Sequence, residues 1–538
     1  MKKGEKFLTK TIRIIATAMC VVLMFSGCGK EEQKSASSTV NYPSDGVYPV
    51  ACDDTLTLWM ELNSAQSQLY SNFAEAEFAQ ELERKTGIKV EYLHPAVGLA
   101  SEQFSLLMTS NNIPDIVVSN WHGYGGQQAL DDGVIQPLNE IMDKWAPNYK
   151  KVLEQMPEVS KMLKTDNGNY YAFGFIREDK ALGTYGGPIV RADWLKKVGM
   201  DIPKTIDDWE KMLTAFKNEI GAESPFMLVN SDGPFRAGLI SGAFGVTDDF
   251  YLDDGVVKYG PVQSGYKDFV TLMKSWYEKG LLDQNFAGAD GKILTNAILN
   301  GKTGATYQLA GGGIGAWLNN QKALGNEEFD LVGVPYPVLN EGDVPKFSQM
   351  DWQYTPLRAW AISRDCKNVE LAARLLDYGY SDEGYLLFNY GTEGKTYEMQ
   401  DGKPVFTDFA LNNPDGTSFS EILTRYTLCS SSGPALQSLE VTNATRSYPQ
   451  QNEAIANWKE SEAAEHLMPM VSFTQEESDE LGSIIVDLNT YQDEMLYGFI
   501  MGTEDIGNWD VYLERMEQIG ASKAVKVYQQ AVERYMDR

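Results

Sequence analysis

The sequence predicts an α/β fold with a parallel sheet, and three stretches near its start carry this prediction. Residues 55–62, TLTLWMEL, alternate apolar and polar side chains, as a half-buried strand does. Residues 70–87, YSNFAEAEFAQELERKTG, have helical character and stop at Gly87, as at a helix C-cap. Residues 113–119, IPDIVVS, form a second strand-like run. A strand, a helix and a strand at this spacing are typical of a parallel α/β sheet.

Turn signals and amphipathic helices follow further along the chain. Asn-Gly or Asp-Gly pairs stand between strand-like runs at 165–173, 251–259 and 398–406, so we expect a β-hairpin at each. Thr205 and Asp208 form a capping box that predicts the start of a helix. Tryptophans in amphipathic helices are expected in the core, and these are Trp194, Trp209, Trp276 and Trp509.

The first 27 residues have the layout of an export signal. Five basic residues and one acidic residue precede an uncharged apolar run from 14 to 25, which is too short for a permanent span of roughly 20 residues. Ser26 and Gly27 then precede Cys28 in a pattern that resembles a bacterial lipobox, with Phe25 where leucine is usual. The resemblance implies lipidation of Cys28 by two acyl chains, which suffices for stable anchoring. An ordinary signal peptide cut near this point is the alternative.

Composition limits what the rest of the chain can do. Residues 28–49 are expected to be a flexible tether because few of them are apolar. Nearly 490 residues follow, enough for two domains and too many for one core. The formal charge of −29 falls to about −33 without residues 1–27, which carry five positive charges and one negative charge. This sign disfavours nucleic acid as a partner.

Neither the cysteines nor the histidines predict a cofactor or a metal site. Beyond Cys28 the chain holds three widely spaced cysteines, which fit neither a disulfide framework nor a zinc pattern. The histidines, at 94, 122 and 466, have no metal-ligand spacing. We therefore expect no cofactor and no metal.

Five stretches together resemble one protein family. They are 187–217, 277–286, 299–318, 362–394 and 487–502, and in this order they resemble the lipoprotein branch of the family-1 extracellular solute-binding proteins of ABC importers, most of which bind sugars. The resemblance covers about residues 50–538. It implies a two-lobed, periplasmic-binding-protein-like (type II) α/β clamp with three interlobe crossings, near 170–175, 334–338 and 388–391. The N-terminal lobe would comprise 50–172 and 338–389, and the C-terminal lobe 173–335 and 391–538.

One departure from the family concerns calcium. Relatives that bind alginate oligosaccharides, among others, carry an Asp/Asn-rich calcium loop just after the helix that corresponds to 205–217. This chain has KNEIGAESPF at 217–226, which lacks the alternating oxygen ligands of such a loop. We predict no structural calcium there.

Candidate ligand contacts follow from what a sugar needs, which is aromatic faces and directed polar groups in a concave cleft. We expect such contacts at the ends of strands and beside the crossings, because these positions face the cleft. The candidates are Trp59, Glu61 and Asn63 after the first strand, Trp121 and His122 after the strand at 113–119, Arg177 after the first crossing, Trp317 after GGGIG, and Asp351, Trp352, Tyr354 and Arg358 around the second crossing. Arg177 could equally pair with a carboxylate, and Trp317 could equally pack inside its lobe.

The leading interpretation is a monomeric, lipid-anchored bacterial protein on the extracellular face of the cell membrane. It would capture a carbohydrate, in the first place an oligosaccharide, and deliver it to an ABC transporter permease, with no catalytic residues. Two alternatives stay open: a lipid-anchored carbohydrate hydrolase, for which the 75 acidic residues offer many carboxylate pairs, and the same clamp binding a peptide or another small solute.

Overall fold

The computed structural model describes residues 48–229, 237–428 and 432–538. The predicted signal peptide, Cys28 and most of the predicted tether lie outside these ranges. All of the described residues belong to one compact unit. In the described ranges, no helix combines the length and the apolar character that crossing a membrane requires.

The larger sheet, counted over the described residues, has six strands in the order β13-β4-β10-β3-β1-β2. β1 pairs in parallel with β2 and β3, as predicted, whereas β10 runs antiparallel to β3 and β4. The strands are β1 (Thr55–Trp59), β2 (Lys89–Leu93), β3 (Ile116–Ser119), β4 (Phe173–Arg177), β10 (Tyr354–Ile362) and β13 (Leu436–Gln437). We call this sheet with its helices lobe 1.

The helices of lobe 1 connect and cover these strands. α2 links β1 to β2 and ends at Gly87, whose φ of +72° forms the predicted C-cap. The helices are α1 (Ser64–Leu69), α2 (Glu77–Thr86), α3 (Ala100–Met108), α4 (Trp121–Tyr124), α5 (Gly126–Asp131), α6 (Asn139–Trp145), α7 (Pro147–Gln155), α8 (Pro157–Met162), α14 (Val369–Tyr378), α15 (Asp382–Tyr390), α16 (Asp408–Leu411) and α17 (Phe419–Tyr426).

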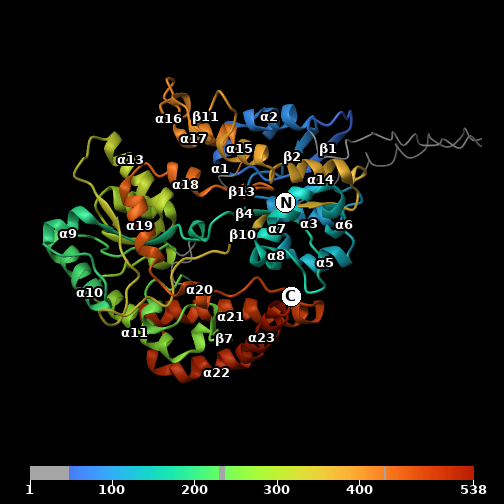
Figure 1. Ribbon diagram of the computed structural model, residues 1–538. Helices are drawn as coiled ribbons and strands as arrows, with labels where there is room; N and C mark the ends of the chain where they lie inside the picture. The colour runs from blue at the N-terminus through green and yellow to red at the C-terminus, as the bar shows by residue number, and fades with distance from the viewer. Residues whose placement is uncertain (1–47, 230–236, 429–431) are drawn as a thin grey trace, which may run out of the picture. The chain divides into compact units, whose positions relative to one another are not determined.

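Lobe 2 is built on a smaller, antiparallel sheet in the order β8-β5-β9. Its helices pack around one hydrophobic core that contains the four tryptophans predicted to be buried. Figure 1 shows α9, α10, α11 and α13 in the left half of the view. The elements are β5 (Gly186–Arg191), β8 (Ala305–Leu309), β9 (Leu331–Gly333), α9 (Ala192–Val198), α10 (Ile206–Ala215), α11 (Ser264–Glu278), α12 (Gly291–Leu299), α13 (Ala316–Ala323), α19 (Pro449–Lys459), α20 (Ala463–His466), α21 (Gln475–Met501), α22 (Trp509–Ile519) and α23 (Ala521–Met536).

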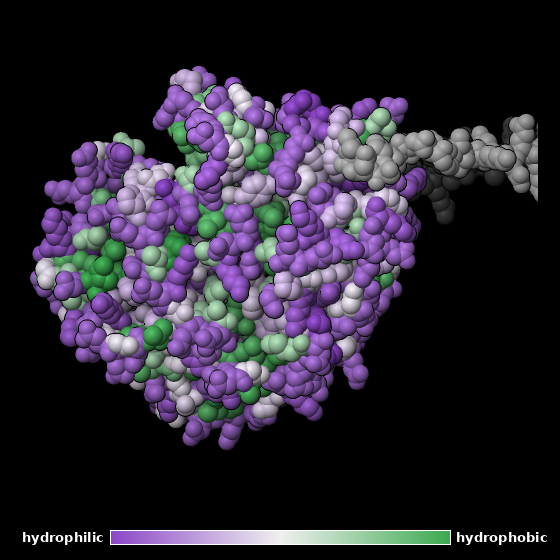
Figure 2. Space-filling model, in the orientation of Figure 1, coloured by the Kyte–Doolittle hydropathy of each residue, from purple (hydrophilic) through white to green (hydrophobic). Residues whose placement is uncertain are grey.

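The predicted capping box and two of the three predicted hairpins are present in the structure. The capping box of Thr205 and Asp208 starts α10. Two hairpins form as predicted, β6 (Phe250–Asp253) with β7 (Val256–Tyr259) and β11 (Tyr397–Gln400) with β12 (Lys403–Phe406). At 165–173 the chain turns back, but the only pairing in this described stretch is an isolated bridge between Lys164 and Tyr170. Most of the face in Figure 2 is hydrophilic, with apolar residues in small separate patches.

The crossing predicted near 334–338 falls between β9 and β10, whereas those predicted near 170–175 and 388–391 fall before the end of β4 and at the end of α15. The chain leaves lobe 1 after β4 and returns between β9 and β10. It leaves again after β13, through α18 (Leu439–Ala444), to reach α19, which packs on β5 and β9. The prediction placed both 173–177 and 436–437 in the C-terminal lobe. These residues lie in the larger sheet instead, because β4 pairs with β10 and β13 pairs with β4.

Candidate functional site

A pocket of about 400 Å³ lies at the carboxyl ends of β1 and β3, where parallel strands open onto a crevice. We call it the lobe-1 pocket. Of the predicted contacts, Trp59, Glu61 and Arg358 line it. Its other lining residues are Met60, Ala100, Ser101, Phe104, Ser105, Val118, Ser119, Asn120, Gly123, Tyr124, Leu357 and Ser432.

Phe104, on α3, organises the aromatic side of the lobe-1 pocket. Its ring centroid lies 6.1 Å from Trp59, 5.3 Å from Trp121 and 5.9 Å from Tyr124. Trp121 is fully buried, and its indole N–H donates to the backbone oxygen of Val117 at 3.0 Å. Contrary to the prediction, Trp121 therefore packs behind the pocket instead of lining it. Phe104 and Tyr124, which sequence reasoning missed, line the pocket in its place.

Polar groups complete this pocket. Among the described residues, the Arg358 guanidinium has no hydrogen-bond or ion-pair partner, and Glu61 is exposed. The hydroxyl of Ser432 is buried and likewise lacks a partner within the described part of the chain. Asn63, by contrast, caps α1, because its side-chain oxygen accepts from the backbone N–H groups of Ala65 and Gln66 at 3.0 and 2.9 Å. Asn63 is thus engaged in a structural role.

A second pocket of about 480 Å³, the lobe-2 pocket, is also rich in aromatic residues. None of its lining residues is among the predicted ligand contacts, although Phe250 and Tyr251 belong to the predicted hairpin at 251–259 or adjoin it. The lining residues are Ala237, Thr247, Asp249, Phe250, Tyr251, Tyr307, Phe347, Ser348, Gln349, Met350, Ala463, His466, Leu467 and Met468. Aromatic faces and polar groups occur together here, as in the lobe-1 pocket.

One segment, 347–358, runs from the lobe-2 pocket to the lobe-1 pocket. In its middle Asp351 pairs with Arg177 at 3.0 Å and accepts from the hydroxyl of Tyr185 at 2.8 Å. The Arg177 side chain is 9% exposed and pairs with a carboxylate, which is the second of the two roles predicted for it. Burial first, and then the Asp351 carboxylate, raise the pKa of Tyr185 well above its usual value, which keeps this hydroxyl a donor.

Gln349 ties the same segment to the first passage. Its side-chain oxygen accepts from the backbone N–H groups of Tyr185 and Gly186 at 2.8 and 3.1 Å. Trp352 is partly exposed, and its indole N–H donates to the backbone oxygen of Met468 at 2.9 Å. The two passages are therefore in direct contact with each other.

The remaining predicted contacts lie away from the pockets' surfaces. Trp317 is 2% exposed and belongs to the core of lobe 2, in agreement with the alternative that it packs inside its lobe. Tyr354 is 1% exposed within β10. His122 is half-buried on α4, where burial, with a smaller effect from Arg538, lowers its pKa to about 4. It is therefore neutral near pH 7.

The chain was compared with known families, curated proteins and solved structures. Residues 65–385, more than half of the chain, match the family model for bacterial extracellular solute-binding proteins. The chain belongs to this family. It is 26% identical to the fructooligosaccharide ABC transporter substrate-binding protein FusA of Streptococcus pneumoniae, over 97% of each chain. It is 23% identical to lipoprotein LipO of Bacillus subtilis, over 94% of this chain and 95% of LipO.

Solved structures support the fold of this solute-binding protein. FusA of S. pneumoniae in complex with kestose has a TM-score of 0.71 at 22% identity, covering 90% of this chain and all of FusA. An extracellular solute-binding protein of Bifidobacterium longum subsp. infantis has a TM-score of 0.73 at 18% identity, covering 89% and 98%. The two-lobed type II fold predicted from the sequence is confirmed.

The stretch after α10, where no structural calcium is predicted, is held in this solute-binding protein by lysines. α10 continues into a π-helix, Phe216–Ile220, in which the Lys217 ammonium donates to the backbone oxygen of Lys279 at 2.5 Å. Lys302 pairs with Glu223 at 3.1 Å. Across the described residues, no group of three or more His, Cys, Asp or Glu side chains could hold a metal ion.

Proposed function

We propose that this solute-binding protein captures an oligosaccharide between its lobes and delivers it to the permease of an ABC transporter. The observation that carries the proposal is the pair of pockets, one in each lobe, that the segment 347–358 connects. A solute that contacts both pockets binds the closed clamp more tightly than the open one, and this difference in affinity drives closure. Names of relatives support the cargo, because FusA is a fructooligosaccharide protein and a B. longum infantis relative binds HMO.

The lobe-1 pocket supplies both kinds of contact that a sugar requires. Phe104 and Tyr124 would stack on the C–H faces of sugar rings, beside Trp59. Glu61 would accept hydrogen bonds from hydroxyl groups, and the free guanidinium of Arg358 would donate them. Asp351 and Trp352 stay predicted contacts, since both are partly exposed between the pockets.

In lobe 2, Tyr251 and Phe347 would provide the facing aromatic surface, with His466 as a polar partner. The bound solute would leave chemically unchanged, since binding and release alone serve the transporter. We further propose that lobe 1 comprises 50–177 and 354–437 and lobe 2 comprises 186–333 and 449–538, joined by the passages between these ranges.

The sequence supports a lipid anchor for this clamp. We propose that the signal is cut before Cys28, that the cysteine carries the lipid, and that the tether at 28–49 holds the lobes on the extracellular face of the bacterial membrane. The protein would act there as a monomer beside its permease.

A thermal-shift screen over glycans tests the proposed function. A ligand at 100 times its Kd stabilises the folded state by about 2.7 kcal/mol, so a true cargo raises the Tm measurably. Fructooligosaccharides, human-milk-type glycans and N-glycan fragments form the first panel, with peptides as the competing class. Chromatography of the ligand after incubation checks that it is returned intact.

The variant Arg358→Gln tests the site. We expect it to weaken binding of the best glycan roughly tenfold, because a charge-assisted hydrogen bond is lost. Arg364→Gln is the matched control, since Arg364 follows β10 at the end away from the pocket and donates to the backbone oxygen of Ser110. Stabilisation by peptides alone, or cleavage of the glycan, would contradict the proposed function. Equal affinity of both variants would contradict the site.

A further inference from the structure

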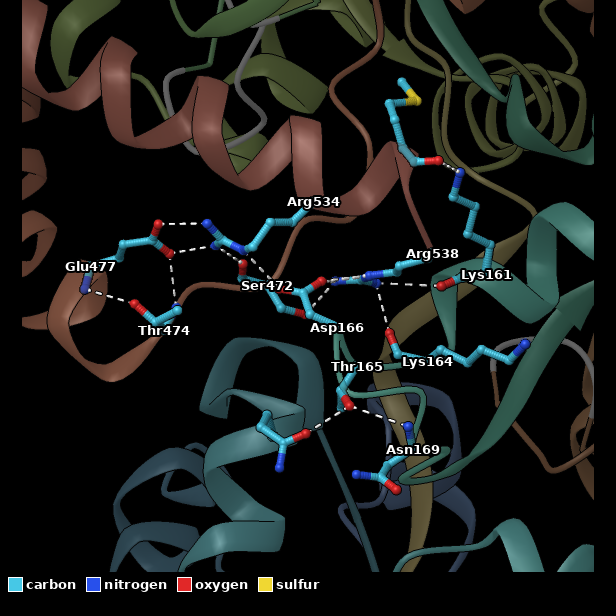
Figure 3. A network of polar contacts seen from close by, with 12 residues as sticks. Lys161, Lys164, Thr165, Asp166, Asn169, Ser472, Thr474, Glu477, Arg534 and Arg538 are labelled. Carbon is cyan, nitrogen blue, oxygen red and sulfur yellow. Dashed lines mark hydrogen bonds and ion pairs between the residues drawn. The ribbon is translucent and has the colours of Figure 1, made fainter.

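A polar network joins the last turns of α23, in lobe 2, to the turn at 165–169, in lobe 1 (Figure 3). Asp166 accepts hydrogen bonds from Nε of Arg534 at 3.1 Å and from Nε of Arg538 at 2.7 Å. The Arg538 side chain is 2% exposed and also donates to the backbone oxygen of Lys164 at 2.7 Å. We call Asp166 with these two arginines the Asp166 latch.

The lobe-2 half of the latch is held in place from within its own lobe. Glu477 accepts from both terminal nitrogens of Arg534, at 2.7 and 2.5 Å. Glu477 is itself fixed, because it forms the capping box of α21 with Thr474. With its terminal nitrogens so engaged, Arg534 presents Nε to Asp166, as Figure 3 shows.

The lobe-1 half of the latch is a tight turn anchored to α5. The backbone N–H of Thr165 donates to the backbone oxygen of Asn169 at 2.9 Å, and Gly168 adopts a φ of +79° that the turn requires. The Thr165 hydroxyl donates to the side chain of Gln127 at 2.7 Å. The Asn-Gly signal in the sequence thus builds a turn that fixes Asp166 toward lobe 2.

The latch lies outside the passages that connect the lobes. Those passages run through 178–185, 334–353 and 438–448, so lobe 2 can rotate about them. Rotation moves Arg534 and Arg538 relative to Asp166. Hydrogen bonds weaken steeply beyond about 3.2 Å, so a displacement of a few ångströms breaks the latch.

We propose that the Asp166 latch positions the lobes in the arrangement that precedes closure, and so lowers the affinity for the solute. The inference rests on the proposed clamp. In this structure the two pockets are separate volumes of about 400 and 480 Å³. In the proposed closure the lobes would move together, so that one solute could contact both pockets. That movement would break the hydrogen bonds of the latch. The free energy lost with them lowers the population of the binding-competent arrangement.

Asp166→Asn tests the latch, because it removes the charge and keeps the size of the side chain. We expect solute affinity to rise roughly three- to tenfold, in line with the loss of a partly exposed ion-pair network. Asp143→Asn is the matched control, since Asp143 pairs at 2.7 Å with Lys150 inside lobe 1. Asp166→Glu restores the charge and should restore an affinity near that of the wild type.

Single-molecule energy transfer provides a readout that needs no solute. Dyes on cysteines that replace Glu140 in lobe 1 and Asp207 in lobe 2, which are 85% and 88% exposed, report the separation of the lobes. Cys366 can remain, since burial raises the pKa of its thiol to about 12, and the other cysteines become serine. We expect Asp166→Asn to enlarge the high-transfer population of the solute-free protein, and Asp143→Asn to leave it unchanged.

The outcomes separate the latch from the proposed function. An unchanged transfer distribution in Asp166→Asn, or a shift to lower transfer, would overturn the latch even if glycans bind well. Weaker binding by Asp166→Asn would overturn it too. If Asp166→Asn shifts the distribution while no glycan stabilises the protein, the latch stands and the proposed cargo fails.

Discussion

At the scale of single residues, His122 carries a clear consequence of its surroundings. Burial lowers its pKa to about 4 in the folded protein, against 6.5 for an unperturbed imidazole. The unfolded chain therefore binds more protons than the folded one between these two values. The stability that this difference supplies is fully present above pH 6.5 and is lost as the pH falls toward 4.

Urea unfolding at pH 7.5 and pH 4.5 measures this effect. We expect the advantage of the wild type over His122→Gln to shrink by about 2 to 3 kcal/mol between the two conditions. Comparing the two proteins at each pH cancels the contribution of the many carboxyl groups. An advantage that is the same at both pH values would show that His122 titrates normally in the folded state.

The aromatic residues show how far sequence context reaches at this scale. The pattern placed Trp59 and Trp121 correctly at the ends of their strands. It could not tell which ring faces the pocket, because that depends on Phe104, which a separate helix inserts between Trp121 and Trp59. Phe104 itself stands between Gln103 and Ser105 in α3, where no motif or turn signal marks it as a pocket residue.

At the scale of elements, the stretch after α10 yields a prediction about metal removal. Calcium binds six to eight oxygen ligands, whereas in this stretch the Lys217 ammonium donates to the Lys279 backbone oxygen. We expect the Tm to be the same in excess EDTA and in excess calcium chloride. Magnesium chloride at equal concentration controls for ionic strength. A Tm that falls with EDTA and recovers specifically with calcium would contradict this account.

The same scale shows why some elements were predictable and others were not. Gly87, the capping box at Thr205 and two of the three predicted hairpins depend on neighbouring residues, and these formed as predicted. β13 has two residues, too few for any periodic pattern, and it pairs with β4, whose residues lie some 260 positions earlier. β10 and β4 pair across some 180 positions, which is also beyond the reach of a local pattern.

At the scale of the whole molecule, these distant pairings determine where each lobe begins. The two-lobed fold followed from the order of several family-like stretches, and the structure confirms it. The place of β4 and β13 in the larger sheet did not follow, because both join it through pairings with residues far away in sequence. The latch was equally invisible, since its acidic and basic residues are more than 360 positions apart.

The proposed lipid anchor gives the last prediction, and it concerns where the whole protein resides. A dually acylated cysteine holds a protein on a membrane stably. Replacing Cys28 with alanine should therefore move the protein from the membrane fraction of the producing cells to the soluble fraction. The variant should bind its solute as the wild type does, because both pockets lie well beyond the tether.

Labelling with radioactive palmitate distinguishes the two ways of processing the signal. The wild type should incorporate label and Cys28→Ala should not. Cys52→Ser, which alters the next cysteine in the chain, should behave as the wild type. If the wild type is already soluble and unlabelled, an ordinary signal peptidase cuts the chain near residue 27. The clamp would then have to reach its permease by diffusion, without the high local concentration that a tether provides.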